Sequence, residues 1–209
     1  PKIAYREAIR KPVTIESKYK KQSGGHGQYG HVKIEFEPYD GDELMFCEKV
    51  FGGAVPKNFF PAVEKGLQEA AEHGSIGGFP VVRLKATLID GSYHPVDSSE
   101  MAFKTAASMA FKDCMKEAQP YLLEPVDSLK ILLPDDKQGD VMSVLSKRRG
   151  SVLGMNSVGG GMTELLAEAP EAELGDFALT LRQITQGLGE FTSEFARYDM
   201  LPPGTEIKS

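Results

Sequence analysis

This 209-residue chain has few cysteines, no long apolar run and no recognisable signal-peptide pattern at its start. Its two cysteines, Cys47 and Cys114, are too few for a scaffold of several disulfides, and their apolar neighbours favour core positions in a reducing cytoplasm. No segment reaches the roughly 18–20 consecutive apolar residues of a membrane-spanning helix, and the polar start has no signal-peptide pattern. We therefore expect a cytoplasmic protein with no membrane contact. The first residue is Pro1 rather than Met, which suggests a piece of a longer protein.

Motifs for nucleotide hydrolysis are missing as well. The pattern G-x-x-x-x-G-K-[ST] does not occur, so the chain has no P-loop and we expect no GTP or ATP hydrolysis by that route. The segment Gly25–Gly30 reads G-x-G-x-x-G, but it continues into an alternating strand instead of a helix, which excludes a dinucleotide-binding fingerprint. The catalytic-loop and metal-binding motifs of protein kinases are absent too.

Catalytic and metal sites have little support. His26 and His31 lack the further ligands that would complete a metal site. His94, Asp97 and Ser98 have the residue types of a hydrolase triad, but no nucleophile elbow is present, and helix capping explains Asp97 or Ser98. The sequence therefore predicts neither catalytic residues nor a metal site.

Charge is unevenly distributed along the chain. The formal net charge is −6, from 24 Lys and Arg against 30 Asp and Glu. Residues 1–33 carry eight basic and two acidic residues, a local charge of +6, whereas residues 34–121 and 122–209 each carry eight basic and fourteen acidic residues. The overall acidity argues against a general nucleic-acid binder, but the basic start leaves a local contact possible.

Alternating apolar residues predict a β-hairpin near the start. Val13–Tyr19 and Val32–Phe36 have the spacing of strands, and Ser23–Gly30, with four glycines in eight residues, is the expected loop between them. Two of these glycines suit a tight turn with positive φ, and the others would let the backbone approach another molecule closely.

Further elements complete the first half. A strand over Phe46–Phe51, a helix between Pro56 and His73, and a strand over Val81–Ile89 are expected. A long helix should follow Asp97, which forms a capping-box pattern with Glu100.

The second half reads strand, helix, strand, strand, helix, strand. Pro120 and Pro125 bracket the expected boundary. The order βαββαβ is that of the ferredoxin-like fold. We therefore predict an α+β protein of two domains over residues 1–121 and 122–200, followed by a tail over residues 201–209.

Several of these motifs together resemble a known family. Ser23–Val32, Gly52–Lys57, Pro61–Gly66 and Asp90–Lys104 look like domain IV of bacterial elongation factor G. Gly139–Val141, Arg148–Gly150, Gly154–Met155 and Thr185–Gly187 look like its domain V. The resemblance runs from about Tyr5 to about Tyr198, almost the whole chain.

This resemblance implies a translational GTPase that moves tRNA and mRNA through the ribosome. GTP and magnesium would bind in an N-terminal domain upstream, and the present residues would need no cofactor. Domain IV would be an elongated α/β domain with a left-handed βαβ crossover, whose tip enters the decoding A site. Domain V would lie near the stalk base of the large subunit. Ribosomal RNA, A-site tRNA and mRNA would be the partners of a monomeric factor.

The expected RNA contacts lie in two loops and in several basic side chains. A neutral histidine can both donate to and accept from a 2′-hydroxyl, and glycine-rich backbone can enter the wide minor groove of A-form RNA. The tip residues are Gly24, Gly25, His26, Gly27, Gln28, Tyr29, Ser92, Tyr93, His94 and Pro95. The candidates for phosphate contacts are Lys18, Lys20, Lys21, Lys33, Lys147, Arg148 and Arg149.

Three departures from the family pattern leave a second reading open. Pro95 stands where an Asp is usual, Leu188 where an Arg is frequent, and His26 where an Arg is common. An elongation factor G-like paralogue that acts in ribosome recycling or ribosomal protection would fit them. A stand-alone regulatory protein, using its ferredoxin-like half to bind a small ligand, is the hypothesis from another class.

Overall fold

The computed structural model describes residues 2–208 and divides into two compact units. The N-terminal unit comprises Arg6–Leu122, and the C-terminal unit comprises Leu123 onward together with the residues up to Tyr5. Each unit has its own cluster of buried apolar side chains. The predicted α+β class with two domains is confirmed. None of the helices in the described part is long and apolar enough to cross a membrane.

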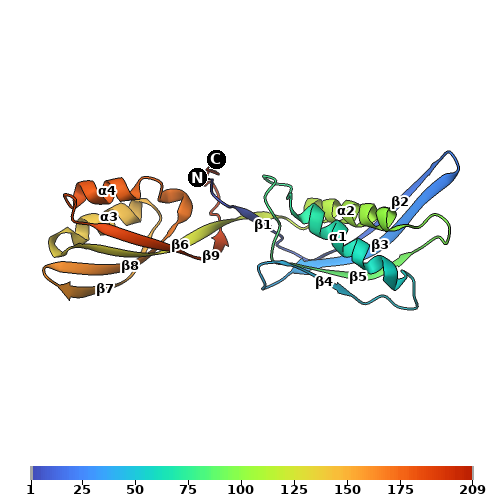
Figure 1. Ribbon diagram of the computed structural model, residues 1–209, viewed down its shortest axis with the longest axis horizontal. Helices are drawn as coiled ribbons and strands as arrows, with labels where there is room; N and C mark the ends of the chain where they lie inside the picture. The colour runs from blue at the N-terminus through green and yellow to red at the C-terminus, as the bar shows by residue number, and fades with distance from the viewer. Residues whose placement is uncertain (1, 209) are drawn as a thin grey trace. The chain divides into compact units, whose positions relative to one another are not determined.

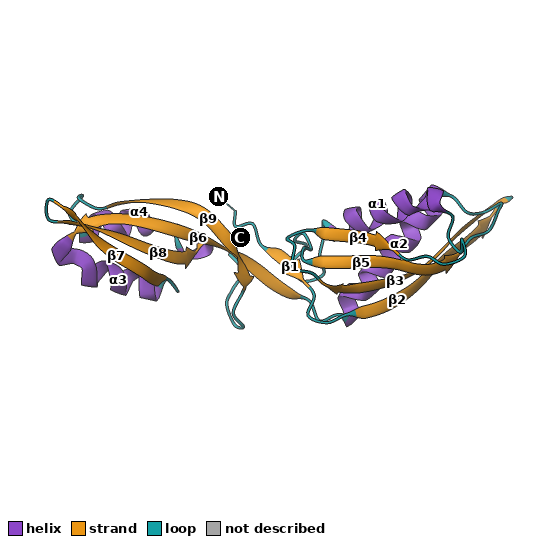
Figure 2. Cartoon of the chain, turned by 90° about the horizontal axis from the view of Figure 1, so that it is seen from below, coloured by secondary structure: helices purple, strands orange, loops and turns teal. Residues whose placement is uncertain are grey.

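The N-terminal unit is a four-stranded sheet with two helices on one face (Figures 1 and 2). The strand order is β2-β3-β5-β4, antiparallel except for the parallel pair β4 and β5, which α1 connects. Alternate residues such as Val32, Ile34 and Phe36 point into the core, where they meet small alanines of α2. The elements of this unit are β1 (Arg6–Ala8), β2 (Val13–Ser23), β3 (His26–Pro38), β4 (Leu44–Glu48), α1 (Phe60–Ala71), β5 (Leu84–Ser92) and α2 (Glu100–Glu117).

The C-terminal unit has the βαββαβ order that the sequence predicts. Its antiparallel strands lie in the order β9-β6-β8-β7, with α3 and α4 together on one face (Figure 1). Leu129, Ile131 and Leu133 of the first strand alternate into the core. The elements are β6 (Tyr121–Pro134), α3 (Gln138–Lys147), β7 (Ser151–Gly159), β8 (Met162–Pro170), α4 (Phe177–Ile184) and β9 (Glu190–Met200).

The expected joint between the halves is continuous strand. The units divide between Leu122 and Leu123, inside the stretch that Pro120 and Pro125 bracket, and β6 runs through this stretch from Tyr121 to Pro134. Pro125 still pairs with Tyr198 of β9 in the ladder. The chain passes between the units twice, after Tyr5 and after Leu122. In the C-terminal unit, Tyr198 Oη donates a hydrogen bond to the Ala4 carbonyl at 2.7 Å.

The capping prediction at Asp97 is wrong. Ser99 is the N-cap of α2, and its Oγ accepts the Ala102 N–H at 3.1 Å. Glu100 is instead the first residue of the helix, where a carboxylate complements the helix dipole.

Candidate functional site

The β2–β3 hairpin extends past the ends of α1 and α2 (Figure 1). It closes with a two-residue turn, Gly24-Gly25, between the paired residues Ser23 and His26. Both glycines have positive φ, 55° and 102°, which suits the type I′ turn that joins two twisted strands. A side chain at either position would meet no atom within 4 Å, so the turn stands open to solvent.

The other two glycines of the predicted loop lie within β3 and serve a different purpose. A Cβ at Gly27 would lie 2.6 Å from an oxygen of Asp97, and one at Gly30 would overlap the Ala102 carbonyl. These positions are therefore glycine because the chain around residues 97–102 packs directly against the hairpin. This internal contact replaces the predicted close approach to another molecule as the reason for Gly27 and Gly30.

Two segments far apart in sequence are joined at this end of the unit. The Tyr29 N–H donates to the Asp97 carbonyl at 3.0 Å, and Ser98 Oγ donates to the Tyr29 carbonyl at 2.9 Å. A second link runs through side chains, with Ser92 Oγ 2.6 Å from Tyr29 Oη and 2.7 Å from His31 Nδ1. The hairpin and residues 92–98 thus form one surface, which we call the tip.

His94 projects from the tip with a defined ring orientation. Its side chain is 54% exposed, and its Nδ1 faces the backbone N–H groups of Val96 and Asp97 at 3.4 and 3.3 Å. Since Nδ1 accepts these protons, the neutral ring carries its own proton on Nε2. The His94 N–H also donates to Ser98 Oγ at 2.8 Å. Ser98 is therefore engaged in holding the loop rather than poised as a nucleophile.

The remaining predicted tip residues are placed on the same surface. His26, Gln28, Tyr93 and Pro95 are exposed, with Tyr93 at 47%. Tyr29 is partly buried, and its ring centroid lies 6.3 Å from that of His94. The tip therefore presents backbone, two histidines and two tyrosines from the predicted set.

The hairpin lysines differ in their surroundings. Lys18, Lys20 and Lys21 are exposed, and none of them forms an ion pair with a described residue. Lys18 Nζ lies 5.9 Å from the Tyr29 ring centroid, at cation–π distance. Lys33 instead sits between Glu16 and Asp90 of the flanking strands, so neighbouring carboxylates offset its charge.

His31 is a tip residue that the sequence did not single out as a contact. Its Nε2 is buried with no hydrogen-bond partner among residues 2–208, and Glu16 Oε1 lies 3.6 Å away. The only signal was a polar residue on the open face of an alternating strand, which is ordinary in an antiparallel sheet.

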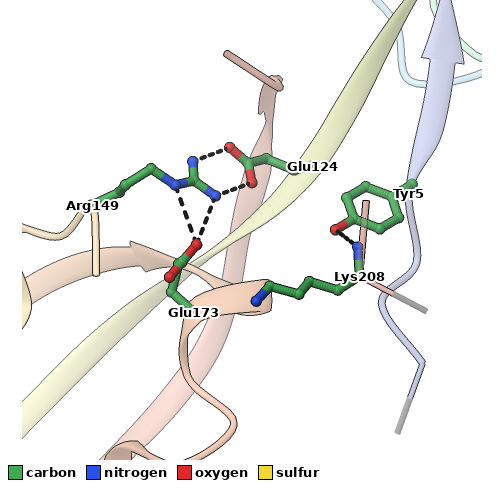
Figure 3. Close-up of polar contacts among 5 residues, drawn as sticks. All are labelled: Tyr5, Glu124, Arg149, Glu173 and Lys208. Atoms are coloured by element: carbon green, nitrogen blue, oxygen red, sulfur yellow. Dashed lines mark hydrogen bonds and ion pairs between the residues drawn. The ribbon is translucent and has the colours of Figure 1, made fainter. Parts of the chain in front are cut away.

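The basic cluster of the C-terminal unit is internally paired. Arg149 donates to both oxygens of Glu124 at 2.7 and 2.9 Å, and to Glu173 at 3.4 Å (Figure 3). Arg148 pairs with Asp176 at 3.0 Å, while Lys147 is exposed. Phosphate contacts by the two arginines stay a prediction, and each would require the guanidinium to leave its carboxylate.

Charge pairing and burial shift several pKa values. The hydrogen bond to Glu124 raises the pKa of Arg149, and the one from Arg148 lowers the pKa of the Asp176 carboxyl. Burial, with the nearby Asp127, raises the pKa of Glu171. Burial also raises the pKa of the Cys114 thiol to about 12, as the predicted core position requires.

Metal-binding clusters do not occur in the described part of the chain. The tip offers hydrogen-bond donors, aromatic rings and cations.

Comparison with known proteins identifies both units. Residues 1–119 match the family model of elongation factor G, domain IV, and residues 121–206 match that of the elongation factor G C-terminus. An elongation factor G-like protein of Thermotoga maritima is 48% identical over the whole chain, which spans 31% of that relative. A crystal structure of a Thermus thermophilus protein superposes with a TM-score of 0.91 at 47% identity, covering 97% of this chain and 30% of its own. The chain belongs to the elongation factor G family, of which it comprises domain IV and the C-terminal domain.

Proposed function

We propose that the tip contacts RNA in the decoding A site while the parent translational GTPase moves tRNA and mRNA through the ribosome. The observation that carries this proposal is the joining of the hairpin to residues 92–98 through Tyr29, Ser92 and Ser98. The joined surface is solvent-exposed at the Gly24-Gly25 turn and at His94, and it carries no carboxylate between Ser17 and Lys33.

The chemistry of the tip suits a minor groove. With Nδ1 engaged by backbone N–H groups, His94 presents an Nε2–H donor, which matches the oxygen of a 2′-hydroxyl. The two-glycine turn brings backbone close without side-chain bulk, and Lys18, Lys20 and Lys21 reach phosphates beside it. Asp97 Oδ2 lies 3.8 Å from His94 Nδ1, so a carboxylate is near the ring although Pro95 supplies none.

Nucleotide chemistry in this proposal belongs to another part of the parent protein. GTP and magnesium would bind an N-terminal domain, and this chain would transmit the result to the ribosome as part of a cytoplasmic, monomeric factor. The C-terminal unit would contact the stalk base of the large subunit.

A paralogue that acts in ribosome recycling or protection is the second candidate. Pro95 next to the tip histidine favours it, and so does the description of the Thermotoga relative as elongation factor G-like. A stand-alone ligand-binding protein fits less well, because family membership extends over both units. Reading the gene upstream of Pro1 separates these from the stand-alone case, since a P-loop GTPase in frame is expected.

The test of the tip is His94→Ala in the parent factor. The loss of one or two hydrogen bonds is expected to cost about 1–3 kcal/mol, which slows translocation ~5- to 150-fold. Single-round translocation measures the rate, while GTP hydrolysis and thermal stability should stay near those of the unchanged factor. A normal translocation rate would refute the contact, and so would a decrease explained wholly by lost stability. Normal translocation with impaired ribosome splitting would favour the paralogue.

A further inference from the structure

The loop between β4 and α1 exposes an aromatic ring. Phe51 is 91% exposed, more than any other large apolar side chain that the structure describes. A phenylalanine ring in water forgoes a large apolar burial. Single exposed apolar residues are common on protein surfaces, so exposure alone assigns no role, and the surroundings of the ring decide.

The loop around Phe51 is held firmly. The Lys49 N–H donates to the Leu88 carbonyl at 2.8 Å, and the Val50 N–H donates to Glu48 Oε2 at 3.0 Å. The Ala54 N–H reaches back to the Phe51 carbonyl at 3.4 Å, and Val55 is buried in the core. The ring is thus exposed on a fixed turn, with its neighbours on both sides anchored.

Glycines make this turn possible. Gly52 and Gly53 both have positive φ, 66° and 69°, and a side chain at either would meet no atom within 4 Å. The chain therefore reverses immediately after Phe51, and the exposed ring is accessible to a flat ligand.

The position of the loop links it to the tip. Because β4 and β5 are parallel, their carboxyl ends lie at the same edge of the unit, and β5 leads directly into residues 92–98. A Cβ at Gly91 would lie 2.7 Å from Val55 Cγ2, so the two loops touch at their bases. Phe51 is thus carried by a loop adjacent to one segment of the tip.

The charge around the ring favours a polyanion. From residue 48 to residue 63 the chain contains two cations, Lys49 and Lys57, and one carboxylate, Glu48, which accepts the Val50 N–H. Both lysines are exposed. An exposed ring flanked by cations is the combination by which proteins bind unpaired nucleotides, the ring stacking on a base and the cations meeting phosphates.

We propose that Phe51 is a stacking platform for an unpaired RNA base that lies next to the RNA backbone contacted by the tip. The proposal rests on RNA contact by the tip and adds a third loop and a different chemistry to it. Stacking tolerates any base, so Phe51 would add affinity without sequence preference.

The chain itself offers a direct test, because it contains no tryptophan. Phe51→Trp places a single indole at the proposed platform. A single-stranded oligoadenylate of about twelve nucleotides, a length within the usual range of single-strand sites, is the probe, and an RNA duplex of the same length is the comparison. Indole fluorescence should be quenched by the single strand and much less by the duplex.

The affinity for the single strand, measured at several salt concentrations, separates base stacking from electrostatic attraction. Phe51→Ala should weaken binding of the single strand ~5- to 150-fold with an unchanged dependence on salt, because a stacked ring releases no counterions. Phe51→Trp should bind as tightly as the unchanged chain. Leu179→Ala removes a 59%-exposed apolar side chain from the other unit and should have no effect.

Three results overturn the proposal. They are an unchanged affinity of Phe51→Ala, equal quenching by strand and duplex, and the absence of any binding of the single strand by the unchanged chain. If Phe51→Ala binds normally while Lys20→Glu reduces the salt dependence, only the platform fails and RNA contact by the tip stands. If no binding occurs, the translocation rate of the His94→Ala factor decides on the tip separately.

Discussion

The hairpin lysines of the N-terminal unit and the arginines of the C-terminal unit are both basic clusters, yet they occupy opposite electrostatic situations. Lys18, Lys20 and Lys21 are exposed, without an ion pair in the described part of the molecule. Arg148, Arg149 and Arg197 each hold at least one carboxylate. A planar guanidinium binds a carboxylate through two parallel hydrogen bonds, whereas a lysine ammonium stays hydrated. The first cluster is thus available to an external polyanion, whereas the second is already paired with carboxylates of its own unit.

The largest expected effect comes from cutting the chain within the boundary that the sequence predicts between Pro120 and Pro125. Glu124 is 3% exposed and lies inside β6, so a chain of residues 125–209 loses the carboxylate of Arg149 and the segment that contains Tyr5. We expect Arg6–Leu122 to unfold cooperatively on heating and residues 125–209 to show no cooperative transition, by circular dichroism.

A chain of residues 123–209, which keeps Glu124, is the matched control and should be the more stable C-terminal piece. If residues 125–209 melt at the temperature of the C-terminal unit in the whole chain, the ion pair between Arg149 and Glu124 is dispensable for folding. The paired arginines would then matter no more for stability than the unpaired lysines.

Arg149→Met should cause the next largest loss. It leaves the Glu124 carboxylate buried without its cation, which costs about 3–5 kcal/mol of the free energy of unfolding. Denaturant unfolding measures the loss, and Glu124→Gln together with Arg149→Met should recover part of it.

Arg197→Met is the control for that experiment, because Arg197 is half exposed and its carboxylate partners, Asp199 and Glu168, are 46% and 17% exposed, against 3% for Glu124. Exposed ion pairs contribute little, so this change should have a much smaller effect. Equal losses in the free energy of unfolding for the two variants would show that burial of the carboxylate does not decide how much an ion pair contributes.

Lys20→Glu with Lys21→Glu should change ribosome binding rather than stability. If both lysines meet phosphates, the slope of log affinity against log salt concentration becomes shallower by about 1.4–1.8. Titrating the parent factor with ribosomes at several salt concentrations measures the slope. Lys85→Glu, at the other end of the same sheet, should leave it unchanged. A slope that is the same in all three proteins would mean that the hairpin lysines are only solvated.

Glu171→Gln should give a small, pH-dependent gain. Burial beside Asp127 raises the pKa of Glu171 in the folded state, so the ionised group is less favourable there than in the unfolded chain. Stability then falls as pH rises through the folded pKa, and Glu171→Gln should melt higher at neutral pH but not below about pH 4, the ordinary range of a Glu carboxyl. Glu206→Gln, at an exposed position of the tail, should show no such difference. A gain that is constant with pH would contradict this origin.

Patterns within short segments predicted most of the fold. Alternation in Val32–Phe36 and the βαββαβ order follow from local periodicity, and both appear in the structure. The length of the hairpin does not follow, because Gly27 and Gly30 suggest a loop while the structure places them in β3 against residues 97–102. Local sequence carries no information on which distant segment a glycine faces.

The sequence also could not predict which of several chemically similar residues takes a given role. Asp97, Ser98 and Ser99 all have capping side chains, and only the path of the loop assigns Ser98 to the His94 N–H and Ser99 to the helix. The partners of Arg149 are 24 and 25 residues away along the chain. The run of three cations that ends at Arg149 therefore could not show that carboxylates pair with it. The two segments of the tip were predicted from their motifs, whereas the ring orientation of His94 follows only from the three-dimensional path of the loop.

The hairpin is a ribbon only two strands wide near its turn, since β5 joins β3 from His31 onward. His26–Gln28 therefore pair with β2 alone, and isolated two-stranded ribbons open readily. Hydrogen exchange should be fastest beside the turn and should slow from Tyr29 onward, since the Asp97 carbonyl accepts the Tyr29 N–H and β5 joins at His31. A partner bound to the hairpin would slow exchange beside the turn and remove this difference in rates. Hydrogen exchange along the hairpin would therefore detect binding at the tip without any label.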